Sequence, residues 1–232
     1  MRARWPALES LAALGASTVA SVVAAAKLLR PDWIQEDALV HQYWMRRFQD
    51  PRLFNDALTA QLLGSQRYPD GYEQLFRLAS QVVDPVAFGE WLGVALMAVS
   101  GWLIFRIVRE HTAWRPAAWI AGALFLALTD LHRFYGGFAR AFVQPAVLLT
   151  VLLAMRGRHL SAALVASGAA LFYPPAALLA VGMLIVSAAR WRDRRPWLDP
   201  RRARYALLAL AIAVVAVVGP ELASGGSPEV LT

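Results

Sequence analysis

The sequence contains no cysteine, so disulfide bonds, thiolate metal ligands and cysteine nucleophiles are excluded. It also lacks the Gly-x-Ser-x-Gly elbow, the His-Glu-x-x-His zinc motif and the Walker phosphate loop. No repeat of fixed period, low-complexity tract or separate soluble domain stands out. We therefore assign no residue as a metal ligand and predict a single domain over residues 1–232, in which any chemistry must come from dispersed polar residues.

Apolar residues dominate the composition, at 58% of the chain against 17% charged residues. Soluble domains are usually about 45–50% apolar. The excess here gathers in long runs with few charges, which is typical of membrane spans. The runs are Leu11–Leu29, Val86–Val108, Ala117–Leu131, Phe142–Met155, Leu160–Phe172, Ala176–Ala189 and Tyr205–Gly219. They predict an all-α, polytopic transmembrane helical bundle of about six or seven spans, in contact with membrane lipid.

Two places along these runs have two interpretations each. The first run is either an uncleaved anchor, favoured by its length and by Glu9, or a signal peptide with a cleavage site at Ala24–Ala26. The sequence Tyr173-Pro174-Pro175 either turns the chain between two short spans or kinks one long helix.

The arginines predict the orientation, because positive residues gather in cytoplasmic loops. If the N-terminus is cytoplasmic and Tyr173–Pro175 is a turn, every arginine-rich connection lies inside: Arg106 to Arg115, Arg156 to Arg158, and Arg190–Arg204. The loops 31–85 and Asp130–Arg140 then lie outside. We therefore predict a multi-pass protein of a bacterial inner membrane.

The formal net charge of +7 could also suit a nucleic-acid partner. The basic residues lie between apolar runs, however, where topology explains them. No nucleic-acid partner is predicted, and Arg190–Arg204 is interpreted as a topology signal that also contacts anionic lipid.

Residues 31–85 differ from the rest, being polar, aromatic and interrupted by turn signals such as Asp50-Pro51 and Tyr68–Gly71. Between the turns, apolar residues recur at helical spacing in Ala38–Phe48 and Leu53–Leu62. This external loop is predicted to hold short amphipathic helices that lie along the membrane surface.

The leading candidates for chemistry are the adjacent acids Glu36 and Asp37, just beyond the first apolar run. A carboxylate at the membrane surface can take a proton from an attacking hydroxyl. It can equally hold a divalent cation beside a phosphate, although nothing in the sequence requires one. The alternative is structural, since acids favour the first turn of a helix.

The second candidate is the loop that begins at Asp130. His132 could shuttle protons, and Arg133 and Arg140 offer planar charged groups suited to phosphate. Gly136 and Gly137 permit a tight turn with exposed backbone amides. An ordinary re-entry loop with interfacial arginines is the alternative. Tyr173, at the proline pair, is predicted to line the same cavity or to form a plain turn.

This arrangement resembles the GT-C superfamily of polytopic membrane glycosyltransferases, which carry an acidic pair early in the first external loop. Glu36-Asp37 matches that pair, and Phe134–Pro145 resembles a recurring segment in bacterial membrane proteins of this type. The number of runs implies a short or truncated member.

The resemblance implies transfer of a sugar from a polyprenyl-phosphate-linked donor to an acceptor at the external membrane face. Asp37 would be the catalytic base with Glu36 assisting, and Arg133, Arg140 and His132 would bind the donor phosphate. Asp130, Gly136, Gly137 and Tyr173 would border the cavity. The alternative is a non-catalytic polytopic membrane protein that binds lipid, either a truncated relative or a complex subunit.

Overall fold

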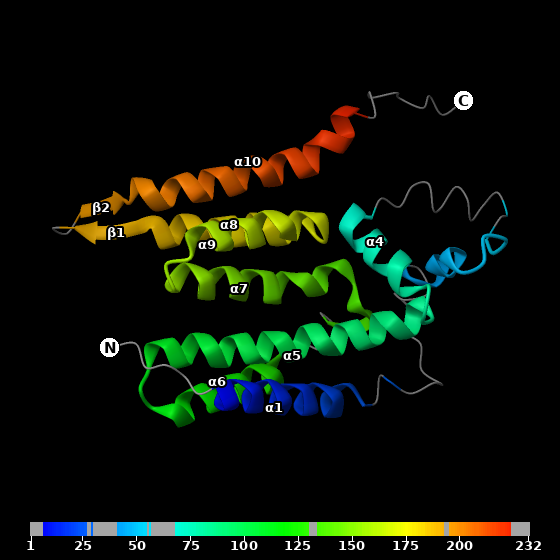
Figure 1. Cartoon of the computed structure of the whole chain (residues 1–232), viewed down its shortest axis with the longest axis horizontal. Helices are drawn as coiled ribbons and strands as arrows, with labels where there is room; N and C mark the ends of the chain where they lie inside the picture. Colours follow the sequence, from blue (N-terminus) through cyan, green and yellow to red (C-terminus); the bar gives the residue numbers. More distant parts are fainter. Residues whose placement is uncertain are drawn as a thin grey trace.

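The computed structural model describes residues 7–26, 29, 41–54, 56, 68–129, 134–192 and 195–223, and these are mostly helical (Figure 1). The α-helices are α1 (Ala7–Ala25), α4 (Asp70–Ala79), α5 (Pro85–His111), α6 (Arg115–Leu128), α7 (Val143–Met155), α8 (His159–Gly168), α9 (Pro174–Ala188) and α10 (Pro200–Ala223). Short 3₁₀ helices are η1 (Tyr43–Phe48), η3 (Tyr135–Gly137), η4 (Ala139–Phe142) and η5 (Ala169–Leu171). The predicted all-α class is confirmed.

One hairpin departs from the helical pattern. Strands β1 (Ala189–Arg192) and β2 (Arg195–Leu198) pair antiparallel, with Arg192 opposite Arg195. The hairpin lies within the segment that we interpreted only as a topology signal. Pro196 disfavours a continuous helix through this segment, and the paired strands satisfy backbone groups that a helix would otherwise have bonded.

Helix starts follow local chemistry. Asp84 caps α5 by accepting hydrogen bonds from the N–H groups of Val86 and Ala87, and Pro85 occupies the first helical position. Pro174 likewise begins α9, directly after the extended residue Tyr173. Because α8 and α9 pack against each other, the proline pair is a turn between two helices rather than a kink.

Two helices are long and apolar enough to cross a membrane, α1 and α5. The 27 residues of α5 extend about 40 Å at 1.5 Å per residue, more than a ~30 Å hydrocarbon core. Helices α6 to α9 are apolar but shorter than about 20 residues. The full count of six or seven spans is therefore not established by helix length alone.

Small buried side chains hold the second half of the bundle together. The largest core cluster joins α7, α8, α9 and α10 and is mostly alanine: Ala154, Ala162, Ala163, Ala166, Ala180, Val181, Leu184, Ala206 and Ala209. Alanine lets helix backbones approach closely, which is how helices associate where no hydrophobic effect drives them together.

The described residues of the segment 31–85, predicted to be an external loop, agree with the prediction only in part. Residues 43–48 form η1, but α4 begins at Asp70, where Tyr68–Gly71 had indicated a turn. Pro69 directly precedes the helix as its N-cap. Tyr72 and Phe76, which lie one turn apart, are the buried residues of α4 and form its inner face.

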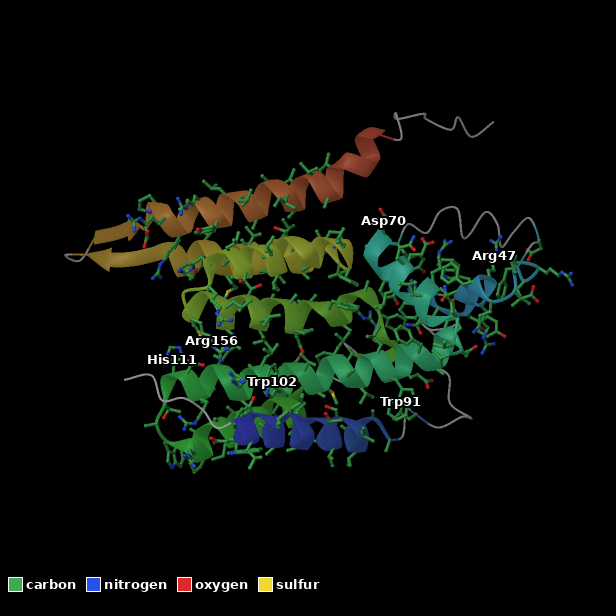
Figure 2. The ribbon with its side chains drawn as sticks, viewed as in Figure 1. Arg47, Asp70, Trp91, Trp102, His111 and Arg156 are labelled. Atoms are coloured by element: carbon green, nitrogen blue, oxygen red, sulfur yellow. The ribbon has the colours of Figure 1, made fainter. Side chains whose placement is uncertain are left out.

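The bundle has two chemically different ends. The N-terminal end of α5 lies with η1, α4 and the 134–142 segment, and we call this the aromatic end. The C-terminal end of α5 lies with Glu9 of α1 and Arg156 of α7, and we call this the arginine end (Figure 2). The hairpin and the start of α10 also lie there (Figure 1). The described arginine-rich connections therefore lie at the same end of the bundle as the start of α1 (Figure 1).

Candidate functional site

The glycine turn before α7 is pressed against α5. Gly136 and Gly137 have φ of 69° and 59°, the left-handed region that favours glycine. A Cβ added to Gly89 would lie 2.5 Å from the carbonyl oxygen of Gly136. A Cβ added to Gly93 would lie 2.2 Å from the carbonyl oxygen of Phe134. The turn can approach α5 this closely only because these α5 positions carry no side chain.

The predicted tight turn is thus present, but the prediction of exposed amides is wrong. Gly136 and Gly137 are both buried, and the N–H of Gly137 donates to the Phe134 carbonyl at 3.0 Å. The backbone of these two glycines packs against α5 instead of facing an anion as we had expected. The glycines therefore position Arg140 rather than form an open anion nest.

Gln42 fastens the segment of residues 41–54 to this turn. Its side chain is completely buried, and Nε2 donates to the Gly136 carbonyl and reaches the Tyr72 hydroxyl at 3.4 Å. Burial raises the pKa of Tyr72, outweighing the opposing effect of the Gln42 hydrogen bond, so this phenol stays neutral. Aromatic and apolar side chains surround the pair: Trp44, Met45, Phe48, Tyr68, Phe76, Phe88, Leu92, Phe142 and Phe172.

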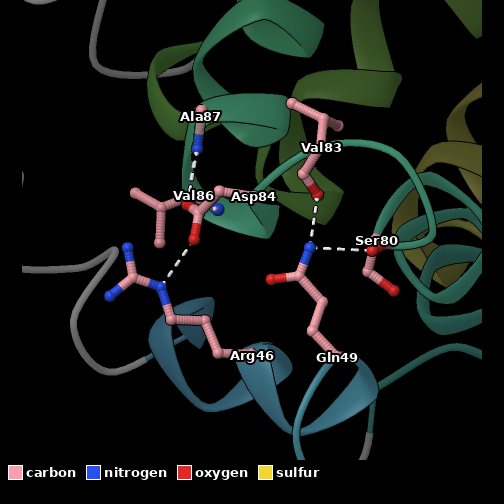
Figure 3. A network of polar contacts seen from close by, with 7 residues as sticks. All are labelled: Arg46, Gln49, Ser80, Val83, Asp84, Val86 and Ala87. Carbon is pink, nitrogen blue, oxygen red and sulfur yellow. Dashed lines mark hydrogen bonds and ion pairs between the residues drawn. The ribbon is translucent and has the colours of Figure 1, made fainter.

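A second set of polar contacts ties η1 to the α4–α5 junction (Figure 3). Arg46 Nε donates to Asp84 at 2.7 Å, and Gln49 Nε2 donates to the carbonyls of Ser80 at 2.8 Å and Val83 at 3.1 Å. Burial tends to raise the pKa of Asp84. The hydrogen bonds from Arg46 and from the backbone, with the charge of Arg46, outweigh burial and lower that pKa. Asp84 is therefore a charged structural residue.

A cavity of about 300 Å³ opens beside this assembly, where α7 and α9 begin. Its polar groups come from Arg140, Gln144 and Tyr173. The Arg140 side chain is exposed, and its guanidinium carbon lies 5.0 Å from the centre of the Phe138 ring. The remaining lining residues are Phe134, Ala141, Val143, Pro175 and Leu179.

Gln144 gives this cavity an unmet hydrogen-bonding capacity. Its Oε1 is buried and has no hydrogen-bond partner among the described residues. A buried amide oxygen without a donor costs free energy that a ligand hydroxyl could recover. The cavity therefore combines a permanent cation, a buried acceptor and a phenol with apolar walls, which suits an amphipathic anion bearing hydroxyl groups.

The structure brings two predicted site residues, Arg140 and Tyr173, to one cavity although 33 positions separate them in the sequence. Gly136 and Gly137 lie in η3, a few residues before Arg140, and pack against α5. Five other predicted residues lie outside the described residues: Glu36, Asp37, Asp130, His132 and Arg133. Among the residues described, no group of three or more His, Cys, Asp or Glu could hold a metal ion.

Sequence reasoning missed the two glutamines. Gln144 is the one amide in the run Phe142–Met155, and Gln42 stands in an aromatic stretch. An isolated polar residue in apolar surroundings was the available signal, since a buried amide must find partners.

Comparison with known proteins adds no relative. No family model matches the chain, no curated protein matches it, and no solved structure matches it. The resemblance to GT-C glycosyltransferases therefore stays a prediction that rests on the residues named for it.

Proposed function

We propose that this chain is a multi-pass inner-membrane protein that transfers a sugar from a lipid-phosphate-linked donor at its aromatic end. The observation that carries the proposal is the cavity of Arg140, Gln144 and Tyr173. Its chemistry matches the three parts of such a donor. A phosphate suits Arg140, a sugar hydroxyl suits the Gln144 oxygen, and a hydrocarbon chain suits Val143, Pro175 and Leu179.

The outer surface of the bundle supports a membrane location. Large apolar side chains are exposed on several helices, beyond what a soluble monomer usually shows. They include Val19, Val23, Leu124, Leu128, Leu164, Leu178, Val186, Leu207 and Val215. The start of α1 lies at the arginine end, and by the positive-inside rule this supports a cytoplasmic N-terminus and an external aromatic end.

The proposed reaction assigns each group one step. An acceptor hydroxyl oxygen attacks the anomeric carbon of the donor sugar, and its proton passes to the Asp37 carboxylate. The bond between that carbon and the phosphate oxygen breaks, and the electron pair leaves with the lipid phosphate. Arg140, with Arg133 and His132, would stabilise the charge that builds on the departing phosphate. A divalent cation at Asp37 and Glu36 is compatible with this scheme but not needed.

The test uses the purified full chain in nanodiscs with a polyprenyl-phosphate sugar. Arg140→Gln should weaken donor binding roughly ten-fold, the usual effect of losing a charge-assisted hydrogen bond. Asp37→Asn should keep donor binding and abolish turnover. Arg77→Gln, an exposed arginine on α4, is the matched control and should change neither. Unchanged turnover in Asp37→Asn would refute the catalytic assignment.

The orientation of the chain can be tested separately by cysteine labelling. Because the chain contains no cysteine, an introduced cysteine is the only thiol that can react. Single cysteines at the exposed positions Asp70 and Arg201 should react with a membrane-impermeant maleimide from opposite sides of the membrane. Labelling of both from one side would contradict the proposed topology.

A second function has one observation in its favour. None of the described residues that line the cavity is a carboxylate. A non-catalytic protein that only binds lipid phosphate would need none. That function predicts donor binding sensitive to Arg140→Gln together with no sugar turnover by the wild-type chain.

A further inference from the structure

A second cavity, of about 350 Å³, lies at the arginine end of the same helix pair. It is formed where α7 and α9 end and α10 begins. Its rim carries Gly157, Ser187 and Arg202, and its walls are Val151, Ala154, Met155, Met183 and Val186. Thr150 lines it more deeply, between one and two helical turns from the rim. The cavity thus has a cationic mouth and an apolar interior.

Thr150 is the unusual residue in this cavity. Its side chain is fully buried, yet Oγ1 has no hydrogen-bond partner among the described residues. A threonine within a helix commonly satisfies its hydroxyl on the carbonyl four residues earlier, as Thr18 does with Leu14 at 2.9 Å. Leaving a buried hydroxyl unbonded is unfavourable, so an acceptor supplied by a ligand would relieve it.

Arg202 supplies the charge at the rim. Its Nη1 donates to the Ser187 carbonyl at 3.3 Å, and its Nε lies 3.3 Å from an Asp199 carboxylate oxygen. Within the described part of the chain these contacts use two of the three guanidinium nitrogens, so Nη2 remains for an anion. Arg156, Arg158, Arg201 and Arg204 lie at the same end and add positive potential around the opening.

We infer that this cavity binds a phospholipid with an anionic headgroup, taken from the leaflet at the arginine end. The lipid phosphate meets Arg202 at the rim. A glycerol ester carbonyl, which sits just below the phosphate, accepts a hydrogen bond from Thr150. An acyl chain lies along Val151, Met183 and Val186. This inference is independent of sugar transfer, because the donor cavity lies at the opposite end of α7 and α9.

The experiment measures lipid binding by native mass spectrometry and lipid-dependent melting of the purified full chain. Phosphatidylglycerol is the probe, and phosphatidylcholine and inorganic phosphate are compared with it. Arg202→Gln and Thr150→Val should each weaken phosphatidylglycerol binding roughly ten-fold. Arg201→Gln removes the same charge from an exposed neighbour and should weaken binding far less than Arg202→Gln does. Thr18→Val, whose hydroxyl already has a partner, is the matched control for Thr150→Val and should leave binding unchanged.

Thr150→Val keeps the test decisive even if Arg202→Gln fails to fold. Without lipid, this variant should melt at or above the wild-type temperature, because it removes an unbonded buried hydroxyl. With phosphatidylglycerol, it should lose most of the wild-type increase in melting temperature. Three results would each overturn the inference. Arg201→Gln could match Arg202→Gln, phosphatidylcholine could bind as tightly as phosphatidylglycerol, or inorganic phosphate alone could give the full effect.

Discussion

Gln42 donates a hydrogen bond to the carbonyl of Gly136, joining two segments that lie 94 residues apart in the sequence. Gln42 is fully buried and Gly136 holds a left-handed backbone conformation. The bond therefore fixes η1 to the turn that leads directly to Arg140. The aromatic end is one assembly, in which η1 and the start of α7 support each other.

Replacing Gln42 with leucine should destabilise this assembly. The Gly136 carbonyl would stay buried without its donor, which costs about 1–3 kcal/mol. Thermal unfolding in detergent should show the loss as a lower melting temperature, and donor binding at Arg140 should weaken with it. Gln81→Leu, at an exposed position between α4 and α5, is the control. Equal melting temperatures for the two variants would show that the bond contributes nothing.

Adding a methyl group to α5 at Gly89 or Gly93 should also disrupt the turn. The new Cβ would lie 2.5 Å or 2.2 Å from a backbone carbonyl oxygen, so helix and turn must move apart. Overpacking of this kind costs about 1–3 kcal/mol. Gly182→Ala in α9 meets nothing within 4 Å and should gain up to about 1 kcal/mol from helix propensity. Opposite shifts of the unfolding transition in the two classes of variant are the expected result.

The positions of the bundle helices were predicted from the sequence to within a few residues, because each apolar run is continuous and is bounded by proline or charged residues. The run Val86–Val108 became Pro85–His111, and Ala176–Ala189 became Pro174–Ala188. Helix α4 was missed because Pro69 and Gly71 resemble a turn locally. The packing of Tyr72 and Phe76 against aromatic residues distant in the sequence stabilises that segment as a helix.

The candidate site was predictable only in part, for a related reason. Arg140 and Tyr173 could be proposed from residue type and side of the membrane, and the structure places both at one cavity. Gln144 becomes a candidate site residue only because its side-chain oxygen is buried without a partner, and a sequence does not show burial. The burial of Gly136 and Gly137 likewise depends on Gly89 and Gly93, whose role appears only when α5 and the turn meet.

Asp84 makes the stability of the aromatic end sensitive to acid. Its pKa is lower in the folded chain, so its charged form stabilises the fold above its ordinary pKa of about 4. That contribution should be lost as the pH falls through the lower folded value. The melting temperature of the wild-type chain should therefore fall more between pH 6 and pH 3 than that of Asp84→Asn.

Substitutions separate the two roles of this carboxylate. Asp84→Ala removes both the cap of α5 and the Arg46 partner and should cost about 1 kcal/mol or more. Asp84→Asn keeps a capping oxygen and should cost less. Asp70→Asn, at an exposed acid, should retain the full acid sensitivity of the wild-type chain. An Asp70→Asn profile as flat as that of Asp84→Asn would assign the effect to general charge instead.

Glu9 and Arg109 connect the start of α1 to the end of α5. Their nearest charged atoms are 3.9 Å apart, and their side chains are only 14% and 11% exposed. Water screens such a pair poorly, and removing one partner leaves the other charge buried. Glu9→Gln should therefore lower the free energy of unfolding by about 1 kcal/mol, because the attraction is lost while Arg109 keeps its hydrogen bond to the Thr112 carbonyl.

Exchanging the two charges distinguishes pairing from mere burial of Glu9. The double variant Glu9→Arg, Arg109→Glu should recover part of the stability that either single change loses, because the attraction is restored in reverse. The exposed pair Glu73–Arg77 on α4 is the matched control, and breaking it should cost at most about 0.5 kcal/mol. If the exchanged pair is no more stable than Glu9→Arg alone, packing rather than charge holds α1 against α5. In that case the small residues Ala13, Ser17 and Ser21 on the buried face of α1 are the next positions to enlarge.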